Sequence, residues 1–365
     1  MASDWSVTLS AHRYLDYLLA IETEYALREF ATEKPAAYPA FSFRAAADPS
    51  IDLSIVMPVW RPHPRHLTRA LDSVARQRLD GLSWELVVCE DGDSNDVASE
   101  ILKKFDGLRV RYSRQPVRLG GLANFNQVLA ESRGRWIHML HQDDFIEPSF
   151  FESVLKADVS NGQIGLRFCR VRLLDESTGQ IRLMFDEQVP RGTFTDFLAR
   201  QTVCQRVQFA GAIFSRRAVE EVGGFDPTIG AACDWDFWAR LGSRFAVFYE
   251  PEQLATYALH SRSWSSTDAH AYEDADSFGK FRILLQRMLG YVAPERRRST
   301  ARGFLQNMLQ RLLFLASRAQ AEANATATQA AGRALLLGCQ EADVFADVEE
   351  ALLGVYPAPA SGPNR

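Results

Sequence analysis

Short apolar segments alternate with amphipathic helical patterns between residues 53 and 140, and this alternation constrains the fold more than any other feature. Apolar runs of strand length occur at 53–57, 84–89, 108–112 and 136–140, separated by helical patterns at 66–78, 97–105 and 123–132. Strands that alternate with helices of about 10–15 residues predict right-handed crossovers and a parallel sheet. The expected fold class is therefore α/β, with a mixed, mainly parallel sheet flanked by helices. Ligands of such sheets bind beyond the carboxyl ends of the strands.

Polar residues follow three of the expected strands, at the end where ligands bind. They are Pro58 and Trp60 after the first strand, Glu90, Asp91 and Gly92 after the second, and His141, Gln142, Asp143 and Asp144 after the fourth. Carboxylates that converge repel each other unless a cation lies between them, and oxygen ligands with a histidine suit Mg²⁺ or Mn²⁺. The alternative is that Asp143 and Asp144 only cap the next helix. Acids at more than one strand end favour the cation site.

Composition excludes several classes of function. Of 365 residues, 47% are hydrophobic and 24% are charged, as in an ordinary globular protein. The formal charge of −5 argues against a nucleic-acid-binding protein, which is usually basic. The five cysteines form no CxxC pair, so neither a zinc site nor a disulfide framework is indicated. We see no signal-peptide pattern and no apolar run of the ~20 residues that cross a membrane, so a cytoplasmic protein is expected.

The rest of the chain has a more mixed pattern. Further strands are expected at 164–174 and 182–185, as a hairpin, and at 207–215 and 245–249, around a helix at 234–241. The pattern then becomes helical to about residue 353. The expected organisation is an N-terminal helical extension and linker at 1–52, an α/β domain at 53–270, a helical region at 271–355 and a disordered tail at 356–365.

Six motifs, in order along the chain, resemble those of one enzyme family. They are Leu53-Ser-Ile-Val-Met-Pro-Val-Trp60, Glu85-Leu-Val-Val-Cys-Glu90-Asp91-Gly92, Gly120-Gly121-Leu-Ala-Asn124, Leu140-His-Gln-Asp143-Asp144, Val222-Gly-Gly-Phe225-Asp with Cys233-Asp234-Trp-Asp236, and Tyr257-Ala-Leu-His260-Ser-Arg262. Together they are similar to the inverting family 2 glycosyltransferases, which have the GT-A fold. Two residues depart from the family pattern. His141 stands at the first position of the Asp-x-Asp metal motif, and Glu90 replaces the more usual aspartate.

The resemblance implies a role for each of these residues. The donor would be a nucleoside-diphosphate sugar, a UDP-sugar above others, contacted through Pro58, Trp60, Glu90, Asp91, Gly121, Asn124, His141 and Asp143. The cofactor would be Mn²⁺ or Mg²⁺ on Asp143 and His260, with Asp144 as a further candidate and Arg262 in a loop over the diphosphate. Asp234 would be the catalytic base for the acceptor hydroxyl, with Phe225 and Trp235 on the acceptor side. The acceptor would be a glycan or a lipid-linked sugar.

Each of these roles has a plainer alternative. Asp234 lies where an aspartate also caps a helix, and His138 lies inside an expected strand and is interpreted as structural. Two other classes of protein were weighed. A nucleotidyltransferase-like enzyme predicts a glycine-rich phosphate loop after the first strand, where this sequence has Pro58-Val-Trp-Arg-Pro62. A catalytically silent glycan-binding homologue would not need to keep Asp91, Asp143, Asp234 and His260 together.

A basic stretch lies beyond the family-like region. Between Lys280 and Arg318 there are nine basic residues and one acid, Glu295. The simpler interpretation is a pair of amphipathic helices with a solvated arginine face. The alternative is peripheral contact with anionic lipid at the inner face of the membrane, where lipid-linked acceptors are found.

Overall fold

The computed structural model describes residues 19, 23, 24, 26–28, 41–92, 95–155, 163–185, 187–263 and 275–308. The chain divides into two compact units. One consists of Ala37–Gln201 and Gln205–Ser266, and the other of Met1–Ala36, Thr202–Cys204 and Thr267–Arg365.

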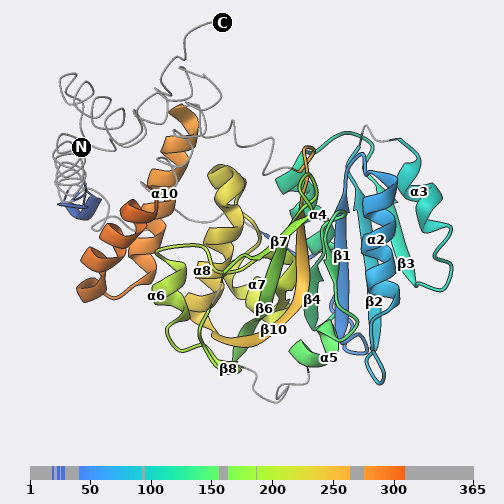
Figure 1. Ribbon diagram of the computed structural model, residues 1–365, viewed down its shortest axis with the longest axis horizontal. Coiled ribbons are helices and arrows are strands. Elements are labelled where there is room, and N and C mark those ends of the chain that lie inside the picture. Colours follow the sequence, from blue (N-terminus) through green and yellow to red (C-terminus); the bar gives the residue numbers. More distant parts are fainter. Residues whose placement is uncertain are drawn as a thin grey trace, which may run out of the picture. The chain divides into compact units, whose positions relative to one another are not determined.

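Within the described residues of the first unit, ten strands form one sheet (Figure 1). Eight strands lie in the order β3-β2-β1-β4-β9-β6-β10-β5, while β7 pairs with β6 and β8 pairs with β10. Their bounds are β1 Leu53–Val59, β2 Trp84–Glu90, β3 Val110–Arg114, β4 Trp136–Met139, β5 Phe145–Ile146, β6 Ile164–Asp175, β7 Gln180–Leu183, β8 Gly192–Thr193, β9 Ala212–Ser215 and β10 Ala246–Leu259. The first four strands of this order are parallel to one another, and β9 joins β4 in the antiparallel sense. The mixed α/β sheet expected from the sequence is confirmed.

Helices cover both faces of this sheet. Their bounds are α2 Pro64–Ala75, α3 Val97–Leu102, α4 Gly121–Ala130, α5 Phe150–Leu155, α6 Phe197–Gln201, α7 Arg216–Val222 and α8 Cys233–Arg244. Because successive side chains of a strand point to opposite faces, Ile55 and Met57 of β1 pack with α2, α3 and α5, whereas Val56 packs with α4, α7 and α8. The central strand is therefore buried on both faces, which explains its continuous apolar sequence.

The sequence predicted that the first strand ends before Pro58, but in the structure β1 continues to Val59. Pro58 lies within β1 opposite Cys89 of β2. The ladder from β1 to β4 ends earlier, at Val56 and Met139. Proline has no N–H to donate to a neighbouring strand. Because Pro58 lies beyond the end of the ladder with β4, the missing N–H costs no hydrogen bond to that strand. The prolyl residue therefore extends β1 toward the site.

Two strands in the second half of the sheet differ from expectation. The hairpin expected at 164–174 and 182–185 is observed as β6 and β7. By contrast, β10 continues to Leu259, well past the expected end at residue 249. Its pairing with β6 resumes after Pro251 because the register shifts between Glu250 and Ala255. The strand expected at 207–215 begins only at Ala212, after a 3-10 turn at Phe209–Gly211 (η1).

The second unit is helical where it is described. Helix α10 spans Ala275–Tyr291, a 3-10 turn (η4) spans Pro294–Arg296, and residues 297–308 are helical. Leu284, Leu285 and Leu289 of α10 are fully buried. The helical pattern expected after residue 270 is thus observed over 275–308, while most of 1–40 and all of 309–365 lie outside the described residues. None of the helices in the described ranges combines the length and the apolar character needed to cross a bilayer.

Candidate active site

The carboxyl ends of β1, β2 and β4 lie side by side and begin the candidate site. Val59 is opposite Glu90 in the β1–β2 ladder, and the Asp91 N–H donates to the Val59 carbonyl (2.7 Å). On the other side of β1, the Leu140 N–H donates to the Val56 carbonyl (3.0 Å). The three polar segments predicted from the sequence therefore leave the sheet at the same edge.

Residues 141–144, which we call the acidic loop, bring three potential metal ligands together. One ligand atom each of His141, Asp143 and Asp144 lie within 4.8 Å of one another. Asp144 is fully buried, and its Oδ1 accepts the N–H of Ala258 (3.0 Å). Nδ1 of His141 lies 4.0 Å from Oδ2 of Asp144, and the His141 ring stacks on Phe125. The family resemblance predicted that His141 contacts the nucleotide. In the structure its ring lies beside the carboxyl groups of Asp143 and Asp144.

Burial and mutual repulsion set the protonation of the acidic loop. Burial, and then the charge of Asp143, raise the pKa of Asp144 well above its ordinary value. Burial also lowers the pKa of His141, so its ring is held neutral. For Asp143 burial acts to raise the pKa, but the hydrogen bond with His260 and the electrostatic effect of the two neighbouring imidazoles outweigh it, and the pKa is lowered. The loop thus holds one ionised carboxylate beside a neutral imidazole.

A divalent cation fits this donor set. Two carboxylates and an imidazole are ligands that Mn²⁺ accepts, and a cation would relieve the repulsion between Asp143 and Asp144. Nε2 of His141 is buried without a hydrogen-bond partner, which leaves a nitrogen lone pair or N–H unused in this geometry.

His260 contacts the same loop from the end of β10. Its Nε2 lies 3.0 Å from Oδ2 of Asp143, and its Nδ1 accepts the N–H of Arg262 (3.2 Å). Because Nδ1 accepts the Arg262 N–H, the ring N–H is on Nε2, which donates to Asp143. In this arrangement His260 orients Asp143. Direct ligation through Nε2 would require the other tautomer and loss of the Arg262 hydrogen bond.

Trp60 lies where β1 leaves the sheet and is held by the acidic loop. Its N–H donates to Oε1 of Gln142 (2.9 Å), and Nε2 of Gln142 donates to its carbonyl (3.1 Å). The indole is 37% exposed, and the guanidinium of Arg118 lies over the ring at 4.1 Å. A half-exposed indole backed by a cation is a suitable stacking surface for a planar ligand.

Asp91 holds the loop that precedes α4. Its two carboxylate oxygens accept the N–H groups of Leu119 (2.6 Å) and Gly120 (2.9 Å). Gly92 completes the turn, because a Cβ there would lie 2.2 Å from the carbonyl carbon of Val117. Gly120 has a φ of +89°, which favours glycine just before Gly121 begins the helix.

Asn124 and Glu90 are buried near the same edge. Nδ2 of Asn124 donates to the carbonyls of Cys89 (3.1 Å) and Val59 (3.4 Å), while its Oδ1 has no partner. Oε2 of Glu90 accepts from Arg114 (2.8 Å) and from the Tyr112 hydroxyl. Burial and Glu90 together raise the pKa of Tyr112 to about 12. These contacts position the ends of β1, β2 and β3.

Asp234 lies in the first turn of α8. Its Oδ2 accepts from Nε2 of Gln205 (2.5 Å), and its Oδ1 accepts the N–H of Trp235 (2.7 Å). Helix α8 reaches the acidic loop through aromatic rings, since Phe209 packs against both Trp238 (5.4 Å between centroids) and His141 (4.7 Å). Phe209 thus connects α8, which carries Asp234 in its first turn, with His141 of the acidic loop.

The two aromatic residues expected on the acceptor side lie in the core. Phe225 is 2% exposed and packs on Phe237 at 4.4 Å between ring centroids. Trp235 is 1% exposed, and its indole N–H donates to the Gln201 carbonyl. Their rings are covered by protein. Asp234, in the first turn of the same helix, is only half-buried.

Arg262 lies in the loop after His260. Its Nη2 donates to the Arg61 carbonyl (3.2 Å), which joins this loop to the segment after β1. Arg262 is exposed, so its remaining N–H groups face solvent beside Trp60 and Arg61.

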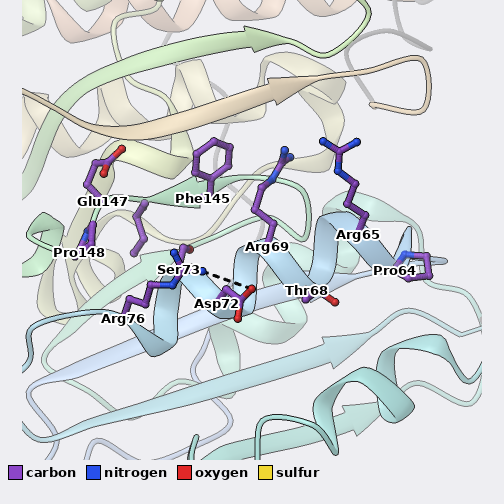
Figure 2. A pocket seen from close by; sticks show the side chains of 11 residues that line it. Pro64, Arg65, Thr68, Arg69, Asp72, Ser73, Arg76, Phe145, Glu147 and Pro148 are labelled. Carbon is purple, nitrogen blue, oxygen red and sulfur yellow. Dashed lines mark ion pairs between the residues drawn. The ribbon is translucent and has the colours of Figure 1, made fainter. Parts of the chain in front are cut away.

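A cavity of about 620 Å³ lies between α2 and β5 (Figure 2). Arg65, Arg69 and Phe145 point into this region in Figure 2. Arg69 pairs with Glu176 (2.7 Å), lies over the Phe145 ring at 4.6 Å and donates from Nη2 to the carbonyl of Asp143 (2.8 Å). The side chain therefore connects this cavity to the main chain of the acidic loop.

Four of these residues had no role in the sequence interpretation: Gln142, Arg69, Arg118 and Gln205. Gln142 lies inside a quoted motif, but its partner Trp60 is 82 positions away. Arg69 and Gln205 lie outside the motifs, and no residue pattern links them to Asp143 or Asp234. Only the fold brings these pairs together.

The mixed, mainly parallel sheet flanked by helices is a GT-A fold. Residues 54–223 match the family model described as glycosyl transferase family 2. This region of the chain belongs to glycosyltransferase family 2, and the protein is a glycosyltransferase.

Known proteins agree with this assignment. An uncharacterized glycosyltransferase of Methanocaldococcus jannaschii is 23% identical over 215 residues, which cover 58% of this chain and 71% of that protein. The succinoglycan biosynthesis protein ExoO of Rhizobium meliloti is 28% identical over 211 residues, 54% of this chain and 58% of that protein. Among solved structures, S. aureus TarS 1–349 in complex with UDP has a TM-score of 0.55 at 15% identity, covering 82% of this chain and 91% of that one. At 15% identity, the similarity to the TarS structure establishes a shared fold.

Proposed function

We propose that this glycosyltransferase moves a sugar from a nucleoside-diphosphate sugar to an acceptor hydroxyl with inversion, and that a divalent cation assists it. The observation that carries the proposal is the acidic loop of a family 2 domain, in which His141, Asp143 and Asp144 approach within 4.8 Å. Family membership gives the reaction class, and the loop gives a place for the cation and the diphosphate.

The donor nucleotide is assigned to the edge formed by β1, β2 and α4. Trp60 offers an exposed ring for the base, and the buried Oδ1 of Asn124 and Oε1 of Glu90 are hydrogen-bond acceptors without a partner. Asp91, with both oxygens occupied by N–H groups, shapes the loop at Gly121. Pro58 carries β1 to the site. A UDP-sugar is favoured, and a UDP complex of the TarS structure supports this choice.

Mn²⁺ or Mg²⁺ is assigned to Asp143, with His141 and Asp144 as the neighbouring ligands and His260 as the group that orients Asp143 or completes the shell. When bound, the cation stabilises the negative charge that grows on the leaving diphosphate. Arg262 lies close enough to the same region to add positive charge through its exposed guanidinium.

Asp234 is the proposed base. Gln205 and the Trp235 N–H orient its carboxylate at the start of α8. Removal of the acceptor proton by such a group is typically worth about 10²–10⁴-fold in rate. Phe225 and Trp235 support this helix start from the core, so their contribution to the acceptor side is indirect.

The acceptor is proposed to be a glycan or a lipid-linked sugar in polysaccharide synthesis, in keeping with the similarity to ExoO. Peripheral membrane contact through 280–318 would be electrostatic. Arg296, Arg298 and Arg302 are exposed, whereas Leu284, Leu285, Met288 and Leu289 of α10 are buried. Flotation with anionic vesicles at low salt tests this contact, and absence of binding would remove it.

A ligand screen of the purified protein tests the proposed function. UDP, GDP and dTDP are added with and without Mn²⁺, and the unfolding temperature is recorded. One nucleotide with Mn²⁺ should stabilise the fold, by about 2.7 kcal/mol at 100-fold excess over its dissociation constant. The matching nucleotide-sugar should then be hydrolysed or transferred. Glycan binding without nucleotide binding would instead indicate a silent homologue.

A further inference from the structure

The side-chain amide of Gln142 holds both polar groups of Trp60's backbone. The oxygen of the amide accepts the Trp60 N–H at 2.9 Å, and its nitrogen donates to the Trp60 carbonyl at 3.1 Å. Glutamine and asparagine carry a donor and an acceptor on one planar group, so few side chains can make this pair of bonds. Gln142 lies between His141 and Asp143 in the acidic loop.

The chain just after Trp60 is held in an uncommon conformation. Arg61 has a φ of +40°, which is rare outside glycine, and its carbonyl accepts a hydrogen bond from Arg262 (3.2 Å). A residue keeps such a backbone conformation only when its surroundings fix it. Gln142 fixes the residue before Arg61, and Arg262 fixes Arg61 itself. Both fixing residues come from segments that carry proposed cation ligands.

We propose that Gln142 is a positioning residue that sets Trp60 for the nucleotide base and ties this segment to the loop that holds the cation. This inference rests on the proposed nucleotide site. Without the amide, the Trp60 peptide loses both of its bonds to the acidic loop, and the indole no longer faces the base in one orientation. The base contact weakens, while the main chain of Asp143 and the carboxylate of Asp144 stay in place because Arg69 and the Ala258 N–H hold them independently.

Two variants and a matched control test the proposal. Gln142→Leu removes both hydrogen bonds, whereas Gln142→Glu keeps the acceptor for the Trp60 N–H and removes the donor. Gln180→Leu makes the same change at an exposed glutamine of β7. The probes are uridine, guanosine and thymidine, which lack the diphosphate and so bind without the cation, followed by UDP, GDP and dTDP. Calorimetry gives their affinities, and Mn²⁺ affinity is read by electron paramagnetic resonance.

We expect Gln142→Leu to bind the preferred nucleoside about 10-fold more weakly, as two modest hydrogen bonds predict. Gln142→Glu should fall between this variant and wild type, and Gln180→Leu should equal wild type. Mn²⁺ affinity of Gln142→Leu should stay within about twofold of wild type. The donor KM should rise while kcat changes little, a separation that a general loss of folding would not produce.

The outcomes separate this inference from the function on which it rests. Wild-type nucleoside affinity in a folded Gln142→Leu protein would overturn the positioning role and leave the glycosyltransferase assignment intact. Loss of Mn²⁺ binding together with nucleoside binding would also overturn it, because the acidic loop itself would then have changed. Failure of wild type to bind any of the nucleoside diphosphates would overturn the proposed donor site, and the inference with it.

Discussion

Two aspartates in the first turn of α8 have opposite environments. Asp234 is half-buried and hydrogen-bonds Gln205, whereas Asp236 is fully buried and pairs with Arg240 (2.8 Å). Asp234→Asn removes the proposed base without removing a buried charge. We expect kcat to fall by about 10²–10⁴-fold, with donor affinity and the unfolding temperature close to wild type. Steady-state transfer assays with nucleotide titration measure both.

Asp236→Asn is the matched control for this prediction. Arg240 donates to the carbonyls of Val222 and Gly224 as well as to Asp236, so the pair fixes the loop before α8. Removing one charge from a buried pair is expected to cost about 3–5 kcal/mol of stability. Urea unfolding measures this loss. If Asp234→Asn lost stability and kept its rate, Asp234 would serve to stabilise the first turn of α8 and would not be the base.

Helix α2 supports the acidic loop through the side chain of Arg69. Arg69, which Figure 2 shows on α2, pairs with Glu176 in the turn after β6 and donates to the Asp143 carbonyl. Arg69→Leu should let the Asp143 main chain move, and we expect Mn²⁺ to bind about tenfold more weakly, as loss of a supporting contact around a metal site does. Mn²⁺ titration followed by electron paramagnetic resonance measures the affinity.

Arg76 lies farther along the same helix and provides the comparison. It is exposed and lies 3.7 Å from Asp72, a surface pair of the kind that contributes little. Arg76→Leu should leave Mn²⁺ affinity unchanged. Equal effects of the two substitutions would mean that general damage to α2, and not the contact with Asp143, weakens the metal site.

The elements that the sequence predicted are those with a repeating pattern. The buried strands and amphipathic helices from β1 to β4 alternate with a clear periodicity. Once the strands are located, the acidic residues that follow them can be placed at one end of the sheet. Strands of two residues, such as β5 and β8, have no period to read, and β10 is interrupted at Glu250–Pro251. The roles of Gln142 and Arg69 depend on contacts across 82 and 74 residues, which no local pattern contains.

The stability of the whole molecule depends on pH through a histidine outside the candidate site. His138 is fully buried in β4, its Nδ1–H donates to the Ala212 carbonyl (2.8 Å), and Phe150 and Phe151 pack on its ring. Burial lowers the pKa of His138 to about 4, from its ordinary value of 6.5. The expectation that this histidine is structural agrees with these contacts.

The sign of the pH effect follows from the lowered pKa. Between pH 6.5 and 4 the unfolded chain protonates this histidine and the folded chain does not, so its stabilising contribution is complete above pH 6.5 and is lost as the pH falls toward 4. From pH 7.5 to 5 the free energy of unfolding should drop by about 2 kcal/mol through His138 alone. His138→Asn keeps a donor for Ala212 but cannot take the proton, so its drop over the same range should be smaller by that amount. Urea unfolding at the two pH values measures it, with His63→Asn at an exposed histidine as the control. An unchanged drop in His138→Asn would show that other groups set the acid sensitivity of the fold.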